Sequence, residues 1–247
     1  MKLDVLAIAA HPDDTELTCS GTLALLAKNG KKVGVLDLTR GELGSRGTPE
    51  LRREEAAAAA RILNLTVREN LGLADGGLVN TPEYRAAIIA KVRHYQPDIC
   101  LINAPADRHP DHGNAARLTI DALFYSGLSK IETLDPQGQS QAPWRPYHIL
   151  HYMQDRPFEP DIVVDISEVM DLKEQAILAF KSQFNVEQTE GEPSTYISRP
   201  DFFRSIQARA RHYGHLGGCT YGEPFLYYNK PIPLNDLGLF FQSKPPR

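Results

Sequence analysis

The chain has 247 residues, 42% hydrophobic and 23% charged, with a formal net charge of −4. This is the composition of an ordinary globular protein that can bury a core without disulfides. The mild acidic balance argues against a nucleic-acid or anionic-membrane protein, and no segment approaches the ~20 apolar residues of a membrane span. Three scattered cysteines without a CxxC pair (Cys19, Cys100 and Cys219) indicate buried thiols, so we expect a soluble, cytoplasmic protein.

Short apolar strands alternate with helices through the first half of the chain. Thr48 and Pro49 are typical of the N-cap and first position of a helix, and Thr81-Pro82 repeats that signature. In chain order we predict strand 3–10, helix 16–29, strand 32–38, helix 48–63, strand 66–71, helix 81–94, strand 98–103 and helix 114–125. This alternation predicts an α/β fold with a mostly parallel sheet and helices on both faces.

The second half is patterned less regularly. We predict a loop over 130–144, strands at 147–152 and 162–166, helix 169–184, loop 188–198, helix 199–216 and an extended tail beyond residue 231. No internal repeat or linker divides the chain. We therefore expect a single domain over 1–247, with a core in 1–128 that is completed by 129–247.

Two runs rich in His and Asp follow the first and fourth predicted strands. Residues 11–14 are His-Pro-Asp-Asp, and residues 109–112 are His-Pro-Asp-His. In a doubly wound sheet of strand order 3-2-1-4 these strands are neighbours where the winding reverses, which is where ligands bind. So many ionisable groups in one crevice would be costly unless something binds there.

A bound divalent metal would offset the cost of placing these ionisable groups together. Two imidazoles and a carboxylate, with one position left for water, are the ligands of a hydrolytic zinc site, although Fe²⁺ suits the same set. A single His-Pro-Asp run is more often a turn whose aspartate caps a helix. The pairing of two such runs favours the metal site over two turns.

The runs His11-Pro12-Asp13-Asp14-Thr15-Glu16 and 109–112 resemble the LmbE/PIG-L family of zinc-dependent N-acetylglucosamine deacetylases. Segments 39–47, 52–56 and 221–225 are similar to its bacillithiol-biosynthesis branch. Thr15 is a small departure, because many relatives pass directly from the aspartates to glutamate. The resemblance implies a Rossmann-like fold and an N-acetylglucosaminide substrate such as N-acetylglucosaminyl malate. It also implies a trimeric or hexameric homo-oligomer.

The resemblance also implies roles for individual residues. His11, Asp14 and His112 would hold the zinc, and Asp13 would be the general base that activates water. His109 would polarise the amide oxygen or protonate the leaving amine. Asp111 would orient a histidine, and we expect it to raise the pKa of His109 and keep it charged. The alternatives are a supporting role for Asp13 beside a ligand and helix capping by Asp111.

Substrate contacts are predicted from chemistry that matches a malate carboxylate. Arg52 and Arg108 flank the site and would bind carboxylates, although a surface arginine is usually only solvated and Arg53 is a neighbouring competitor. Tyr196 would donate to the oxyanion. His212 and His215 are three apart on a predicted helix, where a second metal site is conceivable but packing is commoner.

Three other functions fit the same patterns. One is a deacetylase for another N-acetylated sugar or a mycothiol-like conjugate, and one is an amidase that acts on a thiol conjugate. The third is a nucleotide-binding Rossmann module whose His-Pro-Asp runs are turns. Metal analysis separates the last from the others, and acetate release from different glucosaminides separates the deacetylases.

Overall fold

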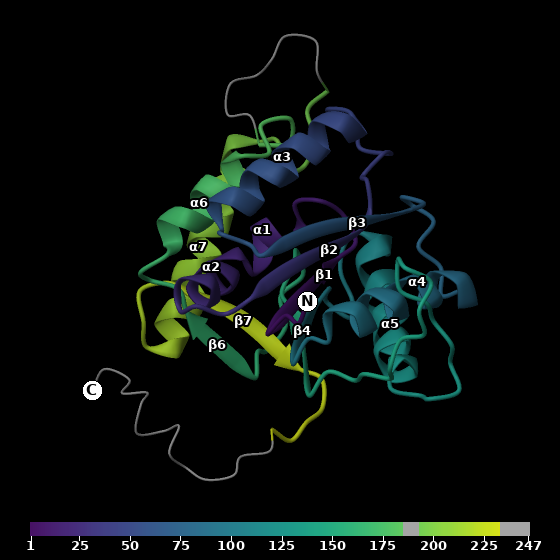
Figure 1. Ribbon diagram of the computed structural model, residues 1–247. Coiled ribbons are helices and arrows are strands. Elements are labelled where there is room, and N and C mark those ends of the chain that lie inside the picture. Colours follow the sequence, from purple (N-terminus) through teal and green to yellow (C-terminus); the bar gives the residue numbers. More distant parts are fainter. Residues whose placement is uncertain (185–192, 233–247) are drawn as a thin grey trace.

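The computed structural model describes residues 1–184 and 193–232, and in this part the strands form one seven-stranded sheet (Figure 1). The sheet order is β3-β2-β1-β4-β5-β7-β6. Strands β1 to β5 run parallel, and β7 is antiparallel to both β5 and β6. The strands are β1 Val5–Ala9, β2 Val33–Thr39, β3 Val67–Leu73, β4 Ile99–Ile102, β5 His148–Tyr152, β6 Ile162–Asp165 and β7 Gly222–Tyr227.

Helices cover both faces of this sheet (Figure 1). Helices α4 and α5 pack against each other on one face, whereas α1, α2, α3, α6 and α7 lie on the other. The helices are α1 Asp14–Thr18, α2 Ser20–Lys28, α3 Pro49–Ile62, α4 Pro82–Tyr95, α5 Pro110–Ser126, α6 Met170–Leu178 and α7 Pro200–Gly217. No described helix is both long enough and apolar enough to cross a membrane.

Alternate side chains of the buried strands enter two different cores. In β1, Leu6 and Ile8 pack with Ile88 of α4 and Leu118 of α5. Val5 and Ala7 of the same strand pack instead with Leu23 of α2. Because successive strand side chains point to opposite faces, a strand that is apolar at every position must be covered on both sides.

The predicted sheet is confirmed in its fold class, its strand order 3-2-1-4 and the position of its winding reversal between β1 and β4. Thr48 and Thr81 cap α3 and α4 as predicted, since each side-chain oxygen accepts from a backbone N–H three residues on.

Two predicted elements differ from the structure, and one strand was not predicted. The helix predicted over 16–29 is two helices, broken at Cys19, and a buried carboxylate caps the second one. The helix predicted over 169–184 ends at Leu178, and β7 was not predicted as a strand. Residues 233–247, predicted as a tail, and part of the loop predicted over 188–198 lie outside the described residues.

Candidate metal and catalytic site

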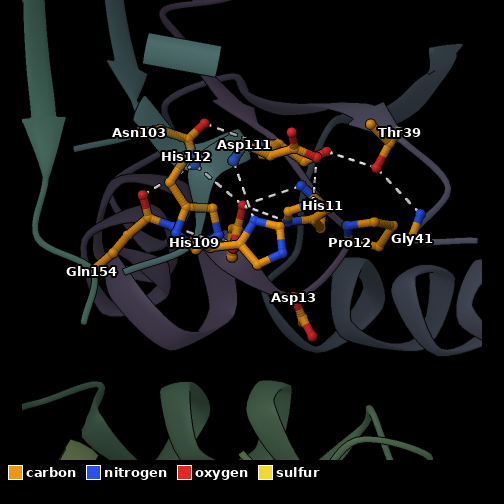
Figure 2. Close-up of polar contacts among 12 residues, drawn as sticks. His11, Pro12, Asp13, Thr39, Gly41, Asn103, His109, Asp111, His112 and Gln154 are labelled. Atoms are coloured by element: carbon orange, nitrogen blue, oxygen red, sulfur yellow. Dashed lines mark hydrogen bonds and ion pairs between the residues drawn. The ribbon is translucent and has the colours of Figure 1, made fainter. Parts of the chain in front are cut away.

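The two His-Pro-Asp runs lie side by side at the carboxyl ends of β1 and β4 (Figure 2). The ring centroids of His11 and His109 are 4.8 Å apart, and those of His11 and His112 are 5.4 Å apart. His11, His109 and His112 each offer a ring nitrogen within 4.8 Å of the others. Segments almost a hundred residues apart therefore meet in one site, because parallel neighbouring strands end at the same edge of the sheet.

Asp14 connects two of these imidazoles. Its Oδ1 lies 3.1 Å from His112 Nε2, and its Oδ2 lies 3.7 Å from His11 Nδ1. Asn103 Nδ2 donates to Oδ2 and Gln154 Nε2 donates to Oδ1, both at 3.2 Å. Burial by itself would raise the pKa of Asp14, but His112 and His11 outweigh it and hold this pKa well below the usual value. The carboxylate is thus fixed in its charged form.

The far nitrogen of each of these histidines faces another carboxylate. His112 Nδ1 lies 2.6 Å from Asp107 Oδ2. His11 Nε2 lies 3.1 Å from Asp75 Oδ1 and 3.3 Å from Asp111 Oδ2. A histidine that binds zinc through one nitrogen usually donates the other N–H to a carboxylate or carbonyl. In donor type and in hydrogen-bond support His11, Asp14 and His112 suit a divalent cation, although the groups whose ligand atoms lie within 4.8 Å of one another are His11 with His109 and His112, and His11 with Asp75 and Asp111.

Both imidazoles have raised pKa values. Burial disfavours the charged form of His11, but Asp111, Asp14 and Asp75 outweigh it and raise the pKa well above 6.5. Burial opposes charge at His112 too, but Asp14 and Asp107 raise its pKa to about 9. Negative charge surrounds these nitrogens, so a cation that displaces their protons would meet a complementary field.

Asp13 lies beside the imidazoles without joining their hydrogen-bond network. Its carboxylate points away from the contacts around Asp111 in Figure 2, yet it lines the same pocket as His11 and His112. Burial raises the pKa of Asp13 to about 7, although Arg52, whose Nη1 is 3.6 Å from Asp13 Oδ2, opposes this shift. A carboxyl group with this pKa can both accept and return a proton near neutrality.

The backbone of Asp13 is also unusual. Its φ of 116° is in a region that L-residues rarely adopt, and it is the N-cap residue of α1. Strained backbone of this kind concentrates at functional sites, where the surrounding structure enforces it.

His109 and Asp111 are arranged differently from the prediction. Asp111 directs its carboxylate to His11, and only its backbone N–H reaches the His109 ring, donating to Nδ1 at 3.3 Å. The pKa of His109 is lowered, first by burial and then by the positive charges of His11 and His112. The prediction that Asp111 keeps His109 charged is wrong. The contact at Nδ1 fits a neutral ring with its proton on Nε2.

Asp111 does not cap α5 either. The N-cap residue of α5 is His109, and Asp111 lies within the first turn.

Arg52 is buried rather than solvated. Its Nη1 donates to the carbonyl oxygen of Pro12 at 3.3 Å, and its Nη2 donates to Gln183 Oε1 at 2.6 Å. Cβ atoms built on Gly41 and Gly44 would lie within 3 Å of this guanidinium. Arg52 therefore supports the His-Pro-Asp-Asp turn through Pro12. Its predicted role in binding a substrate carboxylate stays a prediction.

Arg108 and Tyr196 lie together at the mouth of the site. The Arg108 guanidinium stacks over the Tyr196 ring, 4.3 Å from its centroid, and its Nε is 3.4 Å from Asp155 Oδ2. Tyr196 Oη donates to Asp155 Oδ1 at 2.8 Å, so it does not point at the imidazoles. The Arg108 side chain is 48% exposed and lines the same pocket as His109, which leaves it accessible to a ligand.

The pocket beside the three histidines has a volume of about 220 Å³. A larger groove of about 680 Å³ lies between α3 and β3 and contains none of the three histidines. The candidate site is therefore assigned from the convergence of the two polar runs and not from cavity size.

Several site residues escaped the sequence prediction. Asn103 and Asp107 follow β4 and Asp75 follows β3, so their positions at strand ends could have suggested them. Gln154 gave no such indication. His212 and His215 lie in α7, and neither belongs to the possible metal-binding groups among the described residues.

Comparison with known proteins shows which family the chain belongs to. Residues 6–123 match the family model described as GlcNAc-PI de-N-acetylase, PIG-L. The chain is 32% identical to diacetylchitobiose deacetylase of Thermococcus kodakarensis, over 89% of this chain and 80% of that protein. It is 30% identical to the "Probable N-acetyl-alpha-D-glucosaminyl L-malate deacetylase 2" of Bacillus subtilis, over 74% of this chain and 84% of that one.

The fold is similar to that of a solved structure. The crystal structure of the conserved protein TT1542 from Thermus thermophilus superposes with a TM-score of 0.82 at 40% identity. That superposition covers 95% of this chain and 97% of the other.

Proposed function

Because the chain belongs to the PIG-L (LmbE) family of de-N-acetylases, we propose that it is a zinc-dependent hydrolase that removes the acetyl group from an N-acetylglucosaminide. The observation that supports this most strongly is the arrangement of Asp14 between two imidazoles whose far nitrogens face carboxylates. In the proposal His11, Asp14 and His112 hold the metal. Zinc, when bound, would supply a Lewis acid that acidifies water and polarises a carbonyl group.

Asp13 is the proposed general base. Its carboxylate lines the pocket and its pKa is about 7, so it can take a proton from the attacking water. Asp13 is buried, so the proton that it accepts is shielded from solvent and can pass to the nitrogen of the leaving amine. In this scheme one carboxyl group accepts the proton and then delivers it.

His109 is the proposed donor to the amide oxygen. Its Nδ1 accepts from the backbone N–H of Asp111, so Nε2 carries the proton. A neutral imidazole that holds this proton stabilises negative charge on oxygen as a hydrogen-bond donor. Of the two roles expected for His109, polarising the oxygen is therefore preferred to protonating the amine, which a neutral ring does poorly.

The proposed substrate carries a carboxylate on the sugar, as in the N-acetylglucosaminyl malate of bacillithiol biosynthesis. Arg108 supports this, because its guanidinium is half-exposed at the mouth of the pocket and is preorganised on Tyr196. Arginine binds carboxylates with two parallel hydrogen bonds. The similarity to a relative that is named for a malate substrate points the same way.

Acetate release from three glucosaminides tests this function. We expect N-acetylglucosaminyl malate to be the best substrate, ahead of diacetylchitobiose and N-acetylglucosamine. Arg108→Ala should raise KM for the malate-bearing sugar about 10-fold or more, as expected for a lost charged contact, and should change KM for N-acetylglucosamine little. Arg53→Ala is the matched control, since Arg53 lines the separate groove between α3 and β3.

Two results would contradict parts of the proposal. A higher kcat/KM for diacetylchitobiose would assign the chain to the substrate of its 32% identical relative. Acetate-free turnover of a thiol conjugate would indicate an amidase. If the purified protein binds no metal and releases no acetate, a nucleotide-binding module becomes the better explanation.

We also propose that the protein is cytoplasmic. The three cysteines are free, two of them buried, as expected for a protein of the reducing cytosol.

A further inference from the structure

Asp75, in the turn after β3, contacts both a proposed metal ligand and a loop that faces the substrate. Its Oδ1 lies 3.1 Å from His11 Nε2, and its Oδ2 accepts from the backbone N–H of Leu43 at 2.8 Å. The Asp75 side chain is only 7% exposed. One buried carboxylate therefore joins two parts of the site that are 32 residues apart in the chain.

Leu43 belongs to the glycine-rich loop, residues 40–47. Gly41, Leu43 and Gly44 line the same pocket as His11, His109 and His112. The Leu43 side chain is 71% exposed, so it is available to an incoming sugar. This loop forms a wall of the pocket where the substrate must enter.

The contact at His11 Nε2 determines which nitrogen is free. Nδ1 is the nitrogen that faces Asp14, so in the proposed site Nδ1 offers its lone pair to the metal. A carboxylate at Nε2 keeps the proton there and leaves Nδ1 unprotonated. Asp111 also approaches Nε2, at 3.3 Å, but its same oxygen accepts from the backbone N–H of Gly76 at 2.7 Å.

We propose that Asp75 is a positioning residue that fixes His11 for metal binding and couples this ligand to the glycine-rich loop. The inference rests on the proposed function. It predicts that the loop and the metal site respond together when Asp75 is changed. A residue that only supported the loop would leave metal binding unaffected.

Glu42 provides a matched control within the same loop contact. Its Oε1 accepts from the backbone N–H of Asp75 at 3.0 Å, and its Oε2 accepts from the backbone N–H of Arg40 at 3.2 Å. Glu42 thus supports the loop through Asp75, and both of these contacts are with backbone N–H groups. Glu42→Gln weakens the loop contact, whereas Asp75→Asn weakens the loop contact and the contact to His11.

Asp75→Asn is an informative substitution, because both partners of the Asp75 carboxylate are hydrogen-bond donors. An amide offers one oxygen, so its NH₂ group must face either His11 Nε2–H or Leu43 N–H. Asp75→Ser removes the reach to both partners and is measured alongside, so that the test does not depend on one variant folding.

The experiment measures zinc affinity by competition with a chelator, together with kcat and KM for acetate release. We expect Asp75→Asn and Asp75→Ser to weaken zinc binding about 10- to 100-fold, the usual effect of losing such a support, and to lower kcat. Glu42→Gln should bind zinc like the wild type and mainly raise KM.

Zinc affinity at the wild-type level in a folded Asp75 variant would overturn the inference. Equal losses of zinc affinity in Asp75→Asn and Glu42→Gln would also overturn it, because the loop alone would then explain both. If the wild-type protein itself binds no zinc, the proposed function fails, which is a different result.

Discussion

Asp13 and Asp14 are adjacent in the sequence and yet have opposite properties. The imidazoles of His112 and His11 hold the pKa of Asp14 low against its burial, whereas burial raises the pKa of Asp13 to about 7. Two carboxyl groups with separated pKa values are suited to different tasks. The sequence alone could not make this distinction by environment, because it depends on which carboxylate the imidazoles of His11 and His112 face in the folded chain.

Asp13→Ala should lower kcat by about 10²- to 10⁴-fold, the usual contribution of a general base, while zinc content stays at the wild-type level. Kinetics of acetate release and metal analysis of the same sample check this. A variant that keeps its zinc and turns over at a rate close to the wild type would remove Asp13 from the base role.

His109→Gln tests the other half of the proposed chemistry. We expect kcat to fall about 10²- to 10³-fold, as for other lost oxyanion donors, with KM and zinc content little changed. Loss of zinc together with activity would show that His109 is a metal ligand. This is the main alternative role for His109, because its ring nitrogen lies close to those of His11 and His112.

At the scale of elements, β7 explains why the helix predicted over 16–29 is divided in two. Glu223 of β7 accepts from the backbone N–H groups of Gly21 and Thr22 at 2.9 and 2.7 Å, which caps the start of α2. Lys173 of α6 donates to the same carboxylate at 2.7 Å, and both side chains are 2% exposed. The sequence pattern could not predict this cap, because its carboxylate comes from about two hundred residues away.

Removing one partner of this buried pair should be costly. We expect Lys173→Met to lower the free energy of unfolding by about 3–5 kcal/mol, because Glu223 would be left as a buried, unpaired charge. Urea unfolding measures the change. Lys28→Met is the matched control: its partner Glu168 is exposed, so little change is expected. Similar losses in both variants would refute this account of the cap.

A second buried ionic group links the segment that follows β1 to the sheet. Arg68 of β3 donates to Asp37 of β2 at 2.8 Å and to Glu16 of α1 at 2.7 Å. Burial would lower the pKa of Arg68, but these two carboxylates raise it instead. Glu16 in the His-Pro-Asp-Asp-Thr-Glu run therefore has a structural partner, and this run carries both chemistry and anchoring.

At the scale of the whole molecule, the strand order and the meeting of the two polar runs could be predicted. Both follow from apolar strands, helix caps and the rule that parallel neighbours end at one edge. The support around the ligands could not be predicted in the same way. Gln154 reaches the site through a tertiary contact that no strand-end position indicates, and the contact between Asp111 and His11 reverses the partner that adjacency in the sequence suggested for Asp111.

Zinc stoichiometry of the purified wild-type protein and of His112→Ala, measured side by side by elemental analysis, tests the central claim most directly. We predict about one zinc per wild-type chain and almost none in the variant, because a hydrolytic site that loses one of three protein ligands holds its metal weakly. Equal zinc in both proteins, or none in the wild type, would contradict the claim that the two turns share one cation.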